Sequence, residues 1–248
     1  MTDRTKHVIE GRAWSDFCDA LKGAGEVILR DQPDDPLTRA EGFRYLSRLA
    51  RAALQTFVEH NDPRAPVLQR VVHETAKMGA DNPDAAYFNA ALSGAYTYRI
   101  TGHRGTVRFL SFATQIGHYG RGNGMPPTGQ LGSDELLVAP DGTFDVVVAT
   151  DRPASLEPHQ SFLPMTPETG TLIVRQVRLH PDEKLADLVI RREGADTRPP
   201  PLSAEAHANG LESSGQLVHG AALLFAAWAR MFQEHTNRLP RFDPEISN

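Results

Sequence analysis

Titratable and aromatic side chains concentrate in one stretch of the chain, residues 81–119. This stretch holds four of the five tyrosines, together with three arginines and two histidines. A histidine can act as general acid or base near neutral pH, a tyrosine can donate to a developing oxyanion, and an arginine can neutralise it. The set therefore predicts proton-transfer chemistry on a hydrophobic, oxygen-bearing small molecule: dehydration, isomerisation or a retro-aldol type cleavage.

Three residues are the candidate catalytic groups. His118 is the candidate base, because it ends a predicted strand at the point where a Gly-rich loop begins. Tyr98 is the candidate hydrogen-bond donor, and Arg175, from a later strand, is the candidate cation. Strand alternation places Arg99 on the face opposite Tyr98, so Arg175 is preferred for that role. The candidate substrate-binding residues around them are Tyr45, Tyr87, Tyr96, Arg99, Phe109 and Tyr119.

The same stretch also fits a purely structural interpretation. Tyrosines can cap the edge of a sheet, and the arginines can pair with Asp81, Asp84 or Asp145. His118 is then a solvated loop histidine. The density of such groups favours a cofactor-free lyase or isomerase. A second class of function stays open, a non-catalytic small-molecule-binding or accessory scaffold protein.

No signature of a metal or nucleotide site occurs in the sequence. His73-Glu74 begins like the helix of a zinc protease, but Lys77 stands where the second histidine is required. The glycines of residues 120–124 have neither dinucleotide-binding spacing nor the Lys-Ser/Thr of a P-loop. No Gly-x-Ser-x-Gly motif is present. We therefore expect an activity that needs no cofactor and no metal.

Composition and charge exclude several classes of protein. The 248 residues carry 26 basic and 31 acidic side chains, a net charge of −5, which disfavours nucleic-acid binding through phosphate contacts. The single cysteine, Cys18, cannot form an intrachain disulfide. The longest apolar run, residues 220–228, is too short to span a membrane, and the first residues lack a signal-peptide pattern. We expect a cytoplasmic protein whose partner is a hydrophobic small molecule.

The elements that must position these groups divide the chain into three parts, which we expect to form one integrated domain. Residues 1–93 are predicted to be a helical segment. The spacing of apolar residues from Glu41 onward predicts one helix, and further helices are predicted over 67–78 and 84–92. Residues 94–193 are predicted to be an antiparallel β core. Its strands are expected at residues 95–101, 106–114, 135–138, 143–150, 171–179 and 188–192. Residues 194–248 hold a proline-rich connector and a long helix over 213–236.

Short connections and one apolar stripe refine this plan. Residues 101–105 and 140–142 are predicted hairpin turns, and parallel strands would need much longer crossovers. The apolar stripe of the C-terminal helix, which includes Trp228, predicts either a core contact or a homodimer seam. Full enclosure of the Trp228 ring would make Trp228→Ala cost about 3–5 kcal/mol.

Several motifs occur in the order found in a known bacterial family. They are Asp81-Asn82-Pro83-Asp84, Tyr87, residues 94–100, Gly102, Arg104-Gly105, the 136–144 hairpin and Val174-Arg175-Gln176. On these motifs, residues 40–193 resemble the domain of unknown function number twelve-fourteen. The resemblance implies an antiparallel β-sandwich or jelly-roll-like core, an association with catabolism of hydrophobic compounds, and no established reaction. The Asp-Trp pair of that family is replaced here by Leu179-His180-Pro181-Asp182.

Overall fold

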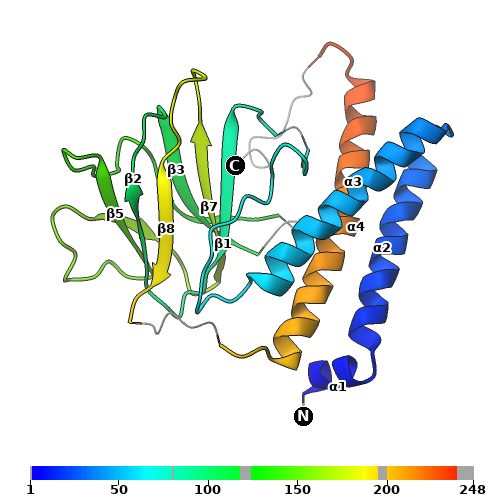
Figure 1. The fold of residues 1–248 in the computed structure, drawn as a ribbon, viewed down its shortest axis with the longest axis horizontal. Coiled ribbons are helices and arrows are strands. Elements are labelled where there is room, and N and C mark those ends of the chain that lie inside the picture. Colours follow the sequence, from blue (N-terminus) through cyan, green and yellow to red (C-terminus); the bar gives the residue numbers. More distant parts are fainter. Residues whose placement is uncertain (1, 80, 118–123, 195–199, 239–248) are drawn as a thin grey trace.

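The computed structural model describes residues 2–79, 81–117, 124–194 and 200–238. A β half and a helical half lie side by side (Figure 1). The fold class is α+β, with N-terminal helices, a β-sandwich and a long C-terminal helix, as predicted. No described helix is both long and apolar enough to cross a membrane.

Three N-terminal helices and the C-terminal helix build the helical half. They are α1 (Asp3–Ile9), α2 (Arg12–Asp31), α3 (Pro36–Leu54), which runs into a π-helical turn η1 (Gln55–Glu59), and α4 (Ala204–Glu234). Asp35 caps α3 by accepting a hydrogen bond from the Thr38 amide, and Pro36 occupies the first turn, where a missing N–H costs nothing. Buried aliphatic side chains of α2, α3 and α4 pack together as a helical core.

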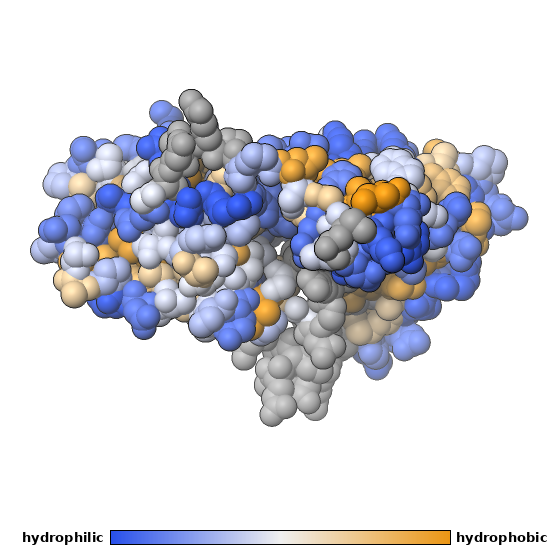
Figure 2. Space-filling model, turned by 90° about the horizontal axis from the view of Figure 1, so that it is seen from below, coloured by the Kyte–Doolittle hydropathy of each residue, from blue (hydrophilic) through white to orange (hydrophobic). Residues whose placement is uncertain are grey.

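The C-terminal helix is confirmed, but it begins nine residues earlier than the sequence predicted. Ser203 caps it by accepting from the Ala206 amide. The N-terminal half of its stripe is buried, whereas the Trp228 side chain is 38% exposed. Within one chain the ring is therefore only partly enclosed, so a core contact alone does not meet the condition for the full cost of Trp228→Ala. Figure 2 shows one face of the molecule, where hydrophilic residues predominate and apolar patches interrupt them.

In the part of the chain that the structure describes, eight strands form two packed sheets. They are β1 (Ala85–Ala91), β2 (Tyr98–His103), β3 (Phe109–Ile116), β4 (Pro127–Leu131), β5 (Thr143–Ala149), β6 (Ser161–Pro164), β7 (Thr169–Val177) and β8 (Asp187–Arg192). The first sheet has the order β1-β7-β3-β4, and the second has the order β6-β5-β2-β8. All pairs are antiparallel except β5 with β6. The large apolar core of the β half lies between the two sheets.

Two predicted helices are wrong. Residues 85–91 form β1, which pairs with β7 over its whole length. Residues 67–78 are largely irregular, and Gln69 pairs with Asn89 of β1 through backbone hydrogen bonds. Both segments carry local helix signals, but backbone pairing with a neighbouring strand decides their conformation, because tertiary context overrides weak propensity.

Two predicted hairpins also need correction. The turn at 101–105 joins β2 to β3, which belong to different sheets, so the chain crosses the sandwich there instead of forming a hairpin. The tight turn at 139–142 is present, closed by a hydrogen bond from the Gly142 amide to the Ala139 carbonyl. Before this turn only Val138 pairs, with Phe144, so no strand covers 135–138. Alternation identifies a strand but does not identify its partner.

Strand β1 lies at the boundary between the β half and the helical half. It is an edge strand of the first sheet and the strand nearest the helices (Figure 1). Phe88 and Ala90 of β1 face the sandwich core. Tyr87 and Asn89 therefore point outward, on the same face as their cross-strand partners Arg175 and Ile173 of β7. This outer face meets the helical half.

Candidate functional site

A pocket of about 270 Å³ lies between the outer face of β1 and β7, the segment 72–81 and helix α4. Its polar members come from the sheet and the segment before it: Asp81, Tyr87, Asn89 and Arg175. Its apolar members are Val72, Met78, Ile173, Leu224, Phe225 and Trp228. An apolar wall with a few converging polar groups is the usual form of a small-molecule site. We call this the Arg175 pocket.

Arg175 and Tyr87 lie directly opposite each other in the β1–β7 pair. The Tyr87 hydroxyl accepts a hydrogen bond of 3.4 Å from the Asn82 amide. Arg175 is half-buried and, within the described part of the chain, its side chain makes no ion pair and no hydrogen bond. A guanidinium without a partner beside an apolar wall is suited to bind a carboxylate or another anionic oxygen group.

Asp81 brings a carboxylate to the same pocket. Its side chain is only 10% exposed and forms a 2.9 Å ion pair with the Lys77 ammonium. Tyr45 of α3 packs in the helical core near this carboxylate. Burial, with the nearby charge of Asp81, raises the pKa of Tyr45 to about 12. Tyr45 therefore stays a neutral phenol at physiological pH, beside the pocket rather than lining it.

The structure places Tyr98 away from the Arg175 pocket. Its side chain is fully buried between the sheets, where its hydroxyl donates to the Pro63 carbonyl (3.0 Å) and accepts from the Ser93 amide (2.9 Å). Burial raises the pKa of Tyr98 to about 12. The expectation that this hydroxyl faces a substrate is corrected, because it already ties two loops to the sandwich core.

We therefore expect Tyr98→Phe to cost about 1–2 kcal/mol of unfolding free energy, since the Ser93 amide and the Pro63 carbonyl lose their partner. The raised pKa adds a second signature. The neutral phenol is favoured in the fold, so its contribution is complete below pH 10 and is lost as the pH rises through about 12. Urea unfolding at pH 7 and pH 11 measures both effects.

Between pH 7 and pH 11 the unfolding free energy of Tyr98→Phe should fall by less than that of the wild type. The loss that the variant still shows is then due to Tyr45, whose pKa is also raised by burial. An unchanged stability at pH 7 would contradict the structural role of the Tyr98 hydroxyl.

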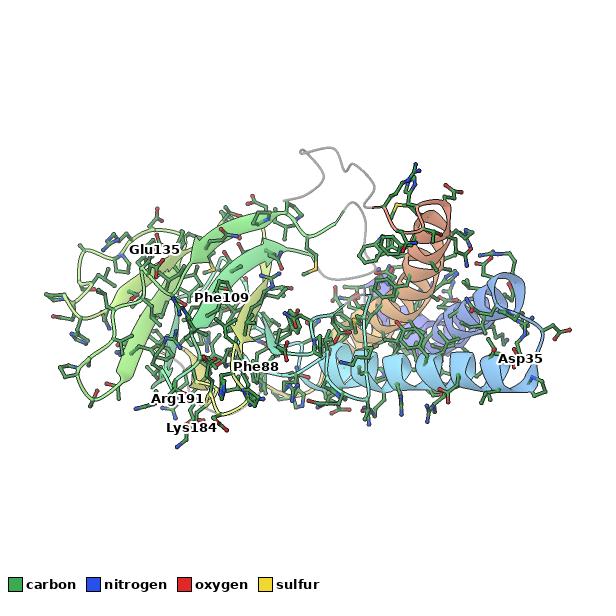
Figure 3. All side chains as sticks on the ribbon, turned by 90° about the horizontal axis from the view of Figure 1, so that it is seen from above. Asp35, Phe88, Phe109, Glu135, Lys184 and Arg191 are labelled. Atoms are coloured by element: carbon green, nitrogen blue, oxygen red, sulfur yellow. The ribbon has the colours of Figure 1, made fainter. Side chains whose placement is uncertain are left out.

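The other predicted residues are dispersed. Tyr96 stacks under Arg192, with 4.8 Å between the guanidinium carbon and the ring centroid. Arg99 pairs with Asp145 on the second sheet, as the structural interpretation of the arginines predicted. Phe109 starts β3 in the β half, away from the helices (Figure 3). The remaining two candidates, His118 and Tyr119, lie outside the described residues.

The Arg99–Asp145 pair explains the charge state of this carboxylate. Burial alone would raise the pKa of Asp145, but hydrogen bonds from Arg99 and Gln160 hold it below its ordinary value. Asp145 is therefore a charged structural group on the second sheet, remote from the Arg175 pocket on the first.

Of the predicted residues that the structure describes, the pocket thus brings together only Tyr87 and Arg175. The sequence predicts for Asp81 a pairing role with arginine and a place in the family motif, and it predicts no role for Asn89 because residues 84–92 carry a helix signal. The alternation of side chains along residues 85–91 could have predicted this strand, because it places Tyr87 and Asn89 on one face. Among the described residues, no group of three or more histidine, cysteine or acidic side chains could hold a metal ion.

A bacterial protein with a similar fold is among the solved structures that match this chain. The chain is 45% identical to an uncharacterised protein from Burkholderia cenocepacia, with a TM-score of 0.89. The match covers 98% of this chain and 66% of that protein. A Vibrio parahaemolyticus protein matches at 14% identity with a TM-score of 0.34, over 74% of this chain and 42% of that one, too low to carry an argument. No protein-family description and no curated protein matches the sequence.

Proposed function

We propose that the protein binds a hydrophobic small molecule that carries an acidic oxygen group, and that it does so in the Arg175 pocket. One observation carries the proposal: the half-buried Arg175 guanidinium has no partner among the described residues and lines the same pocket as Phe225 and Trp228. Placing a charge near apolar surface costs free energy unless it is paired. A bound carboxylate would supply that pair, and the aromatic wall would hold the rest of the ligand.

The experiment that tests binding replaces Arg175 by glutamine. Hydrogen bonds to charged groups contribute about 1.5–3 kcal/mol, so affinity for an aromatic carboxylate such as benzoate or cinnamate should fall by about 10- to 100-fold. Isothermal titration calorimetry measures the change. The melting temperature without ligand should hardly move, because the Arg175 side chain makes no ion pair or hydrogen bond with the described residues.

Arg191→Gln is the matched control. Arg191 is an exposed arginine of β8 in the second sheet, so its replacement should leave affinity unchanged (Figure 3). Equal losses in both variants would mean that only the overall charge of the protein matters. Full affinity in Arg175→Gln would overturn the proposal.

A second candidate is the cofactor-independent lyase or isomerase. The observation that favours it is the Asp81 carboxylate, which lines the pocket together with Arg175 and Tyr87. A carboxylate base and a cation that stabilises a developing oxyanion are the two requirements of acid–base chemistry next to a carbonyl group. Asp81 takes the role that the sequence suggested for His118.

Four further parts of the proposal concern the family, the pathway, the location and the assembly of the protein, and the first three rest on the sequence alone. They are membership of the twelve-fourteen family, a place in the catabolism of hydrophobic compounds, and a cytoplasmic location. A homodimer seam along α4 is a further part, supported by the exposed Trp228 and Phe232 side chains, which are 38% and 47% exposed.

A further inference from the structure

A second, smaller cavity of about 50 Å³ adjoins the Arg175 pocket, and Val72 and Asn89 line both. Phe57 of η1 and Leu217 of α4 contribute apolar wall to this smaller cavity. Its polar members are Thr56, His60, Asn61, Gln69, Asn89 and Thr171. The space suffices for a hydroxyl group or a few water molecules but not for a whole ligand.

Gln69 is the unusual member of this cavity. The residue is only 8% exposed, and its side-chain oxygen Oε1 has no hydrogen-bond partner among the described residues. Buried side-chain oxygens in proteins nearly always accept a hydrogen bond, so a donor is missing here. The backbone of Gln69 is held in place, because its amide donates to the Asn89 carbonyl (2.9 Å) and its carbonyl accepts from the Asn89 amide (2.8 Å).

The strand register gives the distance between this acceptor and the cation. Arg175 lies opposite Tyr87, and Gln69 pairs with Asn89, two residues further along β1. Gln69 pairs with the outer edge of β1, whereas β7 pairs with its inner edge. The two residues are therefore separated by two strand spacings of about 4.8 Å across the sheet and by two residues of about 3.4 Å along it, which places their backbones about 12 Å apart. A hydroxylated aromatic acid together with its two hydrogen bonds spans such a distance. The aromatic side chains Phe225 and Trp228, whose ring centroids are 5.4 Å apart, line the pocket into which the ring of such an acid would fit.

We propose, resting on the proposed function, that the ligand class is the hydroxylated aromatic acids. The carboxylate pairs with Arg175, the ring lies against Phe225 and Trp228, and the hydroxyl passes between Val72 and Asn89 to donate to Gln69 Oε1. A buried acceptor without a partner discriminates against ligands that lack the donor, which makes Gln69 the residue that determines specificity.

The test compares each hydroxylated acid with its parent in wild type and in Gln69→Leu. The probes are 4-hydroxybenzoate with benzoate and 4-hydroxycinnamate with cinnamate, titrated by calorimetry. We expect the wild type to bind a hydroxylated acid about tenfold more tightly than its parent, the value of one good hydrogen bond. Gln69→Leu should abolish this preference and keep the affinity for the parent acid. Gln130→Leu, at an exposed position of β4, should keep both.

The outcomes separate this inference from the proposed function. If the parent acids bind but the hydroxyl adds nothing, or its advantage survives in Gln69→Leu, then a water molecule satisfies Gln69 and the inference fails alone. If none of the four acids binds to the wild type, the proposed function fails and the inference fails with it. Should Gln69→Leu not fold, Gln69→Met removes the same acceptor with a more adaptable side chain.

Discussion

Replacing Asp81 by asparagine is expected to lower catalysed proton exchange by about 100- to 10,000-fold, the usual contribution of a positioned general base. Asparagine keeps the shape of the side chain but cannot take up a proton. The ion pair with Lys77 would be lost at little cost to the fold, because the Lys77 side chain is 48% exposed. Affinity should therefore change much less than exchange.

Phenylpyruvate is a suitable probe, because it joins a carboxylate to an aromatic ring and has exchangeable benzylic protons. Deuterium incorporation in D₂O, followed by NMR, measures the exchange, and calorimetry measures affinity for the same compound. Asp84→Asn is the matched control, since this exposed carboxylate lies three residues away and does not line the pocket. A wild type that does not accelerate exchange would leave binding as the function, and full exchange in Asp81→Asn would exclude Asp81 as the base.

Gly102→Ala should destabilise the protein by more than about 4 kcal/mol or prevent its folding. Gly102 lies in β2 between β5 and β8, and an added Cβ would lie 1.8 Å from the Asp187 carbonyl oxygen and 3.2 Å from the Phe144 ring. The carbonyl is backbone of a paired strand, so it cannot move aside without breaking the sheet. Changes of this size are rare and arise when overpacking cannot relax.

Urea unfolding followed by circular dichroism measures this effect. Gly132→Ala provides the control, because its added Cβ meets only a flexible Glu135 side-chain oxygen at 3.8 Å. Gly132→Ala should unfold near the wild-type midpoint. A small loss of stability in Gly102→Ala would mean that β2 and β8 are not packed as closely as described.

The sequence alone predicted the fold class and most regular elements. The helical spacing that begins at Glu41 is borne out by α3, and the alternating residues of 143–150 and 171–179 by β5 and β7. These patterns are local, because hydrophobic periodicity depends on residues a few positions apart. The sequence also placed Tyr98 and Arg99 on opposite faces of one strand, and the structure agrees, with Tyr98 buried and Arg99 paired with Asp145.

Only the tertiary structure decided which of these faces is buried and which residues meet. Tyr98 is a core residue because the first sheet packs against its face of β2. The sequence of residues 94–103 does not indicate which face of the strand is covered. Tyr87 and Arg175 come together through the pairing of β1 with β7. Asp81, from the segment that precedes β1, lines the same pocket, which α4 covers on the side of the helical half. Such contacts depend on long-range pairing and packing, whereas sequence patterns report only the period and polarity of each segment.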